Sequence, residues 1–267
     1  MAQAKSGGLL DAFLPNRSIS RTTLITIVVI QIALFLLIWI TSPFKVLPKP
    51  GEVASAFSNL WNTRGLGKEL LTSIGLNFKA VMISSAICLV LAYFTVIPFF
   101  RPIVSALSKA RFLSLIGFSL VFTLTLGGGP ALKLSLLVFG MSVFFLTSMA
   151  SVVSAIPKAE FDHARTLRMP EWKVVWEVVV LGTFDQAFEV MRQNAAIGWM
   201  MLTMVEGIAR AEGGIGILLE SEKRFFHIDG VFAIQITILV VGLFQDYLIG
   251  FVRNLLCPYS NLSLERK

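Results

Sequence analysis

The sequence predicts an all-α, polytopic membrane protein with about six transmembrane helices. Apolar residues make up 55% of the 267 positions, and mean hydropathy is +0.78. Only 15% of residues are charged, whereas a soluble domain carries about 25%. Apolar runs recur along the chain between short polar stretches, and several approach the roughly 20 residues that a spanning helix needs.

The basic residues are distributed between these apolar runs. The net charge of +7 could indicate a nucleic-acid partner, but the 23 lysines and arginines do not form one patch. A larger share of them flanks one predicted membrane face, so we expect that face to be cytoplasmic and expect no nucleic acid. The two cysteines, Cys88 and Cys257, do not indicate a disulfide framework or a metal site.

The polar residues 1–23 form a predicted cytoplasmic segment, and 24–41 form the first span, interrupted only by Gln31. No small-residue cleavage site follows, which favours a retained span over a removed signal peptide. The transmembrane domain is predicted to cover 24–252, and 253–267 to form a cytoplasmic tail. The five further spans are predicted at 74–98, 112–126, 132–153, 187–209 and 230–252.

The stretches between the spans carry turn and interface signals. In 47–65, a Pro-Gly start is followed by Val53, Phe57, Leu60 and Trp61 at helical spacing, which predicts a short interfacial helix. Arg101 and Pro102 are predicted to mark a tight loop, and the glycines and proline of 127–130 break the third span from the fourth.

The longest polar interruption in the second half is 153–183. Ser154 is predicted to cap a helix, and Pro157 suits a first helical turn. Pro170 disfavours continued helix at Met169 and can open a second helix. We therefore predict two short amphipathic helices joined at a bend between two spans.

Each short helix has a predicted apolar side. A helix of this kind outside the bilayer can dock into a groove on a soluble partner. The apolar positions are Phe161, Ala164 and Leu167 in the first helix, and Trp172, Val175, Trp176 and Val179 in the second.

Several kinds of chemistry have no signature in the chain. There is no GxxxxGK[ST] phosphate loop, and no carboxylate occurs between Glu69 and Glu160. His163 and His227 are too far apart for a typical zinc protease motif. We expect no catalytic residue, no metal and no cofactor.

The fifth predicted span carries polar residues. Arg192, Trp199 and Glu206 are seven apart, which places them near one helix face, and Arg210 can pair with Glu206 four residues earlier. One interpretation is that this face lines a translocation path or a seam with a second subunit. The alternative is that the two arginines mark the span's ends and Trp199 only packs.

Several segments between residues 47 and 258 resemble the permease subunit of bacterial ATP-binding-cassette importers, in the nitrate/sulfonate/taurine/bicarbonate group. Residues 47–50 are similar to the family's Leu-Pro-x-Pro, and 162–167 to its Glu-Ala-Ala-Arg-Thr-Leu. The downstream matches are Arg192, Gly198, Trp199, Glu206, the Gly-Ile-Gly of 214–216, Asp229 and 231–233.

The chain departs from the family pattern and looks like a divergent member. Asp162 and His163 replace the family's Glu and Ala, and Arg168 occupies the position of a glycine that permits a left-handed bend. Arg168 must therefore tolerate strain or accompany a different turn. The family's later Leu-Pro is Leu181-Gly182 here.

The resemblance implies a type I importer permease with a cytoplasmic coupling helix at 158–169. ATP hydrolysis would take place on a separate ATPase subunit, and a conformational switch would follow its closure. The implied coupling residues are Phe161, Asp162, His163, Ala164, Arg165, Leu167 and Arg168. The implied path or seam residues are Arg192, Trp199, Glu206 and Arg210.

The resemblance also implies an assembly in the bacterial inner membrane with both termini cytoplasmic. Two permease subunits, as a homodimer, would pair with two ATPase subunits. A periplasmic or lipoprotein binding protein would deliver a small solute, and an anion such as nitrate, sulfonate, taurine or bicarbonate is one hypothesis. A secondary transporter without an ATPase and a non-transporting structural membrane subunit are the alternatives.

Overall fold

The computed structural model describes residues 20–44, 46–209 and 213–258. Throughout that part of the chain, every regular element is a helix. The elements are α1 (Arg21–Thr41), α2 (Pro50–Thr63), α3 (Leu66–Tyr93), η2 (Phe94–Val96), α4 (Phe100–Lys109), η3 (Ala110–Phe112), α5 (Leu115–Leu126), α6 (Pro130–Ser154), α7 (Lys158–Thr166), α8 (Glu171–Val174), η4 (Val175–Leu181), α9 (Phe184–Ile208), α10 (Ile215–Arg224) and α11 (Ile228–Leu256).

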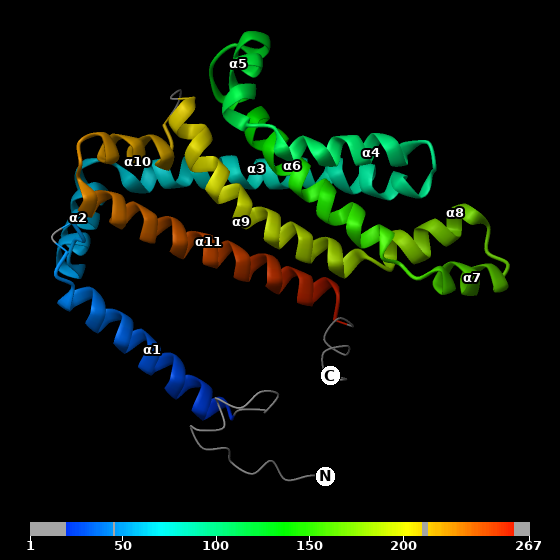
Figure 1. Ribbon diagram of the computed structural model, residues 1–267, viewed down its shortest axis with the longest axis horizontal. Helices are drawn as coiled ribbons and strands as arrows, with labels where there is room; N and C mark the ends of the chain where they lie inside the picture. Colours follow the sequence, from blue (N-terminus) through cyan, green and yellow to red (C-terminus); the bar gives the residue numbers. More distant parts are fainter. Residues whose placement is uncertain (1–19, 45, 210–212, 259–267) are drawn as a thin grey trace.

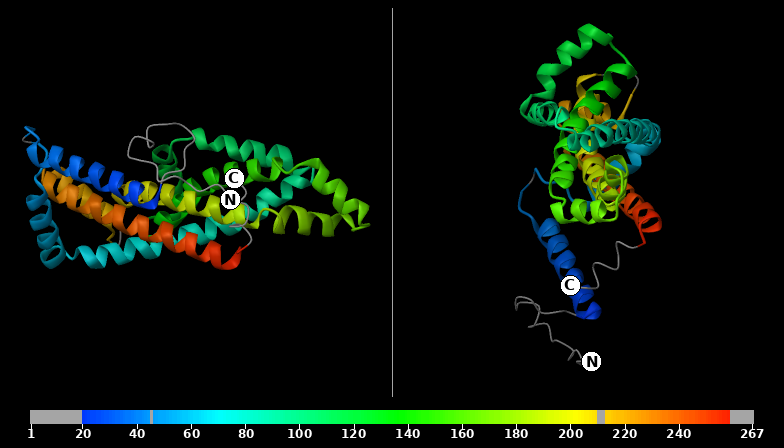
Figure 2. Two further views of the ribbon diagram at one scale, coloured as in Figure 1. Left: turned by 90° about the horizontal axis from the view of Figure 1, so that it is seen from below. Right: turned by 90° about the vertical axis from the view of Figure 1, so that its right-hand side faces the viewer.

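The long helices run roughly along the length of an elongated bundle (Figure 1). α3, α6, α9 and α11 form its centre, and the most extensive packing is between α3 and α6. α2 and α10 lie at one end, and α7 and α8 protrude at the other, as Figure 2 also shows from below. The bundle therefore presents two distinct ends.

Four helices are long and apolar enough to cross a membrane: α1, the stretch Leu66–Val96, α6 and α11. A fifth span results if the bent pair Phe100–Phe112 and Leu115–Leu126 counts as one. The prediction of an all-helical chain with several membrane spans is confirmed. Six spans would also require α9, which is not among these candidates.

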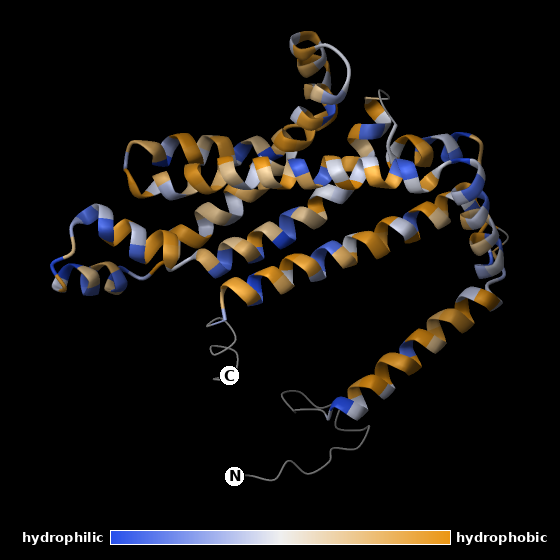
Figure 3. Cartoon of the chain, turned by 180° about the vertical axis from the view of Figure 1, so that it is seen from behind, coloured by the Kyte–Doolittle hydropathy of each residue, from blue (hydrophilic) through white to orange (hydrophobic). Residues whose placement is uncertain are grey.

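α1 matches the first predicted span, and none of its residues is buried. Ser20 caps it, because its hydroxyl accepts a hydrogen bond from the Thr23 amide at 3.2 Å. The Trp39 indole nitrogen donates to the Pro48 carbonyl at 3.0 Å. Figure 3 shows α1 as a mostly apolar helix set apart from the bundle, and its own apolar side chains are exposed on all its sides.

The predicted interfacial helix is α2. Pro50 opens it, and the Glu52 carboxylate accepts from the Lys49 amide at 2.8 Å. Gly65, at φ 66°, reverses the chain into α3. α3 starts earlier than the predicted span 74–98, because its first turns are anchored by the fully buried Leu66 and not by lipid.

The third predicted span is broken. Arg101 and Pro102 lie inside the first turn of α4 and not in a loop, which corrects the prediction. The reversal comes before them, and the Arg101 guanidinium donates to the carbonyls of Thr95 at 3.0 Å and Val96 at 3.3 Å. α5 then bends away from α4 by 109°, so 112–126 is not one straight continuation.

Glycines set the next boundary as predicted. Gly127 and Gly129 have φ of 74° and 104°, which bulkier residues rarely adopt. Pro130 follows at the first helical position of α6. α6 and α11 occupy the predicted fourth and sixth spans, each extended by a few residues.

α9 is the polar helix of the bundle. It packs against α3, α6, α10 and α11, and Arg192, Trp199 and Glu206 find partners on these helices. The buried amide of Asn194 makes no hydrogen bond within the described residues. Two main cores flank it. The core nearer α2 and α10 includes Leu66, Leu137, Leu202 and Ile234, and the core nearer α7 includes Phe145, Met149, Val179 and Val190.

Candidate functional site

The segment between α6 and α9 folds as two short helices, as predicted. We call α7, α8 and η4 together the elbow. Pro157 precedes the first residue of α7, whereas Ser154 ends α6 and donates its hydroxyl to the Ser151 carbonyl at 2.9 Å. The prediction that Ser154 caps the following helix is therefore wrong, because two residues separate it from the true cap.

Arg168 makes the bend between α7 and α8. Its φ is 58°, in the left-handed region that glycine adopts most easily. The chain thus keeps the bend that the resemblance implied and places an arginine in it. The sequence left two possibilities, that Arg168 tolerates a left-handed backbone conformation or that the turn is of a different kind. The structure has the first.

An ion pair braces the bend. Arg165 Nε donates to Glu171 Oε1 at 3.0 Å, and its NH2 donates to Oε2 at 3.2 Å. Asp162 lies 3.5 Å from the same guanidinium. The hydrogen bond with Glu171 raises the pKa of Arg165, and the same bond lowers the pKa of Glu171. Because both side chains are exposed, solvent screens the pair.

The predicted coupling residues divide between two sides of α7. Ala164 is 5% exposed and Phe161 packs against the core nearer α7, so both face their own chain. Leu167 is 59% exposed. The other residues of the predicted set, Asp162, His163, Arg165 and Arg168, are exposed as well.

The predicted apolar side of the second helix is only partly right. Val179 is buried, but Trp172 and Trp176 are 72% and 57% exposed, and Val174 is buried instead. Trp172 and Val174 lie in α8, whereas Trp176 and Val179 lie in η4, a π-helix, whose wider turn departs from the 3.6-residue period on which the prediction rested. Gly182 ends η4, where an added Cβ would collide with the Val178 carbonyl oxygen.

Glu206 is fully buried near the opposite end of the bundle. Its Oε1 accepts from the Ser73 hydroxyl at 2.6 Å, and its Oε2 accepts from the Gly216 amide at 2.8 Å. The Ser73 hydroxyl in turn accepts from the Ile215 amide at 2.8 Å. The carboxylate therefore fixes the N-terminal turn of α10 to α3 and α9, where the helix dipole favours a negative charge.

Two more charged residues belong to this cluster. Lys133, from α6, is 3% exposed and donates to the Gly213 carbonyl at 2.6 Å. Glu69, from α3, accepts from the Gly214 amide. Helices α3, α6, α9 and α10 thus converge on one glycine turn. Arg210, the predicted partner of Glu206, lies outside the described residues.

Arg192 belongs to an ion-pair network at the end of α9 nearer the elbow. It pairs with Glu189 at 2.8 Å and with Asp246 at 3.4 Å. Arg253 of α11 reaches Glu189 at 3.2 Å and Asp185 at 3.9 Å. This network joins α9 to α11.

Trp199 lies between these two clusters. It is 5% exposed, and its indole nitrogen donates to Gln245 Oε1 of α11 at 2.7 Å. Asn77 of α3 donates to the same oxygen at 3.2 Å. Arg192, Trp199 and Glu206 therefore lie along α9, as predicted, but each bonds different neighbours, and the structure does not gather them into one site.

The sequence analysis did not predict the hydrogen-bond and ion-pair partners of Arg192, Trp199 and Glu206. Glu189 could have been found, because it precedes Arg192 by three positions on one helix. Gln245, Asn77, Ser73 and Lys133 come from distant segments, and no local pattern connects them to α9. Within the described ranges, no group of three or more His, Cys, Asp or Glu could hold a metal ion.

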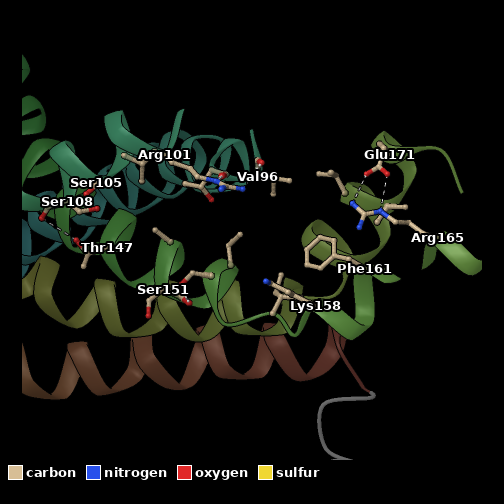
Figure 4. Close-up of a pocket in the computed structure, with 18 residues that line it drawn as sticks. Val96, Arg101, Ser105, Ser108, Thr147, Ser151, Lys158, Phe161, Arg165 and Glu171 are labelled. Atoms are coloured by element: carbon tan, nitrogen blue, oxygen red, sulfur yellow. Dashed lines mark hydrogen bonds and ion pairs between the residues drawn. The ribbon is translucent and has the colours of Figure 1, made fainter. Parts of the chain in front are cut away.

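A cavity of about 980 Å³ opens between the elbow and the bundle. It is lined by η2 and α4, by the end of α6, and by the elbow helices α7, α8 and the start of η4. Figure 4 shows Arg101 and Lys158 extending into it from opposite walls, with Phe161 and Arg165 of the elbow lining it as well.

Comparison of the chain with protein-family models and with curated proteins finds no match.

Proposed function

We propose that this chain is the membrane-spanning permease subunit of an ATP-driven importer, and that α7 couples it to an ATPase. The observation that carries the proposal is the elbow. It is a short, braced helix pair that projects from one end of an apolar helical bundle (Figure 1). Such an element can receive force from a soluble partner and transmit it to the helices on either side.

The packing of the elbow supports this role. Phe161 packs α7 against the core that includes Phe145 and Val179, and Ala164 is buried beside it. α7 follows α6 in the chain, and η4 leads into α9. A displacement of α7 would therefore move two central helices together. Of the predicted coupling residues, those exposed to a partner are Asp162, His163, Arg165, Leu167 and Arg168.

The proposed assembly contains two copies of this chain, two ATPase subunits and an extracytoplasmic binding protein in a bacterial inner membrane. The elbow and both termini would face the cytoplasm. α9 would act as the predicted fifth span, shielded from lipid by its neighbours. The proposed cargo is a small solute, with anions such as nitrate, sulfonate, taurine or bicarbonate as the class to test first.

Co-purification tests the coupling role. The chain would be coexpressed with an ATPase encoded beside its gene, and the amount of ATPase retained would be measured. We expect Asp162→Lys to release the ATPase and Ala164→Asp to disrupt the elbow itself. Lys223→Glu, an equal reversal on an exposed residue of α10, is the matched control.

Normal retention of the ATPase by Asp162→Lys would contradict coupling through this surface. Reconstituted uptake separates the two alternatives. Uptake driven by an ion gradient without an ATPase would identify a secondary transporter, and the buried Glu206 and Lys133 give that test a structural basis. ATPase binding without any uptake would identify a non-transporting subunit.

A further inference from the structure

The cavity beside the elbow has an uneven charge. Three basic residues line it, Arg101, Lys158 and Arg165, against one acid, Glu171. Arg165 is already paired with that acid. Within the described chain, Arg101 and Lys158 pair with no carboxylate, and the Arg101 contacts are to backbone carbonyls. Two positive charges therefore remain without a counter-charge from the protein.

The position of Lys158 strengthens this positive potential. It is the first residue of α7, so its ammonium adds to the partial positive charge of the helix N-terminus. Glu160 lies in the same first turn but does not line the cavity. Lys158 and the N-terminus of α7 therefore both contribute positive potential to this side of the cavity.

Hydroxyl groups complete the set of donors. Ser105 and Ser151 line the cavity, and within the described ranges their hydroxyls make no side-chain hydrogen bond. A guanidinium, an ammonium and free hydroxyls together form the donor set that proteins use for phosphate groups. The volume of about 980 Å³ exceeds the size of a bare phosphate, and the apolar walls at Val104 and Val153 would accommodate an organic substituent.

We propose that this cavity binds a phosphate ester, with Lys158 and Arg101 as its main contacts. The cavity lies where α3 and α6, two candidate spans, come to an end, which is the depth of lipid headgroups. A phosphorylated soluble molecule and an anionic phospholipid headgroup present the same chemistry here. Binding would tie α7 to the turn before α4 and stiffen the elbow.

The test uses the purified full chain alone, so its result does not depend on the proposed transport function. Hydrogen exchange of 158–171 is measured in phosphatidylcholine vesicles with increasing glycerol 3-phosphate, and separately in vesicles containing phosphatidylglycerol. We expect protection of α7 to increase with one of these probes. Protection by glycerol 3-phosphate would identify a soluble source, and protection by phosphatidylglycerol alone would identify a lipid source.

Variants locate the site. Lys158→Gln should weaken the apparent affinity about tenfold, as expected for the loss of one charge-assisted contact, and Lys158→Arg should restore it. Lys173→Gln makes the same charge change on α8 outside the cavity and should leave the affinity unchanged. No protection by either probe, or equal responses of Lys158→Gln and wild type, would overturn the proposal.

Discussion

Arg168 has a left-handed backbone conformation that glycine adopts more easily than arginine does. A side chain in the left-handed region carries about 1–2 kcal/mol of strain, whereas glycine carries none but loses about 0.5–1 kcal/mol more backbone entropy on folding. The resemblance to the permease pattern singled out position 168, because that pattern has a glycine there. It could not show whether the bend survived, since that depends on the packing of α7 and α8.

Arg168→Gly should therefore stabilise the chain by roughly 0.5–1 kcal/mol. Thermal melting of the purified protein in detergent measures the change. Arg168→Ala retains a Cβ at φ 58° and serves as the control, because it removes the guanidinium without relieving the strain. A larger gain from alanine than from glycine would show that side-chain charge, and not the backbone, limits stability here.

Glu206 is the buried acid whose carboxyl group bonds Ser73 and the first turn of α10. Glu206→Gln keeps the shape but replaces one acceptor with an amide donor, so either the Ser73 hydroxyl or the Gly216 amide loses its partner. We expect a loss of roughly 1–3 kcal/mol, seen as a lower melting temperature. Ser73→Ala should produce a loss in the same range, since Glu206 and the Ile215 amide both bond that hydroxyl.

Glu220→Gln, on α10 but with no bond to the turn, is the matched control and should melt like wild type. An unchanged melting temperature for Glu206→Gln would mean that Glu206 does not fix the turn. The sequence singled out Glu206 because an acid in an apolar stretch is unfavourable. The sequence did not reveal that Glu206 holds the start of α10, because its hydrogen-bond partners come from α3 and from the first turn of α10.

The elbow is the element whose stiffness depends on an exposed ion pair. The pKa of Glu171 is lowered in the folded chain by its hydrogen bond with Arg165, so its contribution to stability is present above the unfolded pKa, which is the ordinary value of 4.5. That contribution is lost as pH falls through the lowered folded value. We expect the angle between α7 and α8 to become more variable in acid.

Spin labels at positions 163 and 172, both exposed, can measure the distance between the two helices. Glu171→Gln should broaden the distance distribution at neutral pH and remove its acid dependence. Glu160→Gln, at an exposed acid in the first turn of α7, should behave like wild type. Identical distributions for all three proteins would show that packing of Ala164, and not the ion pair, holds the bend.

Periodicity predicted most elements and failed where the helix type changed. The elbow and α2 follow from proline positions and apolar spacing. The apolar side of the second elbow helix does not, because Val174 of α8 is buried in place of Trp172, and because η4, from Val175 on, has more residues per turn than an α-helix. The broken third span likewise depends on a 109° bend, which the apolar composition of 112–126 could not indicate.

On the scale of the whole molecule, the two ends of the bundle should face opposite sides of the membrane. A single cysteine at position 173 reports on the elbow end, and one at 223 on the α10 end; both sites are exposed, whereas Cys88 and Cys257 are buried. In intact cells, we expect a membrane-impermeant maleimide to label 223 but to reach 173 only after permeabilisation. The reverse pattern would place the elbow outside and contradict ATPase coupling.

For α9, its hydropathy and its position in the bundle point to different answers on whether it crosses the membrane. The sequence predicted a span at 187–209, yet α9 is too polar to count as one by length and composition. Its position among four helices resolves the difference, because their side chains satisfy Glu189, Arg192, Trp199 and Glu206. A lone helix with these residues would not be stable in lipid.

α1 has the opposite character, and its isolation affects how the chain is made. With no buried residue and a single side-chain bond to Pro48, it needs no later helix in order to be complete. As the ribosome releases the chain, this rod can partition into the bilayer and satisfy its own backbone before the remainder exists. Except at Trp39, which packs against the core nearer α2 and α10 and bonds Pro48, natural variation could exchange α1 for another apolar sequence of equal length.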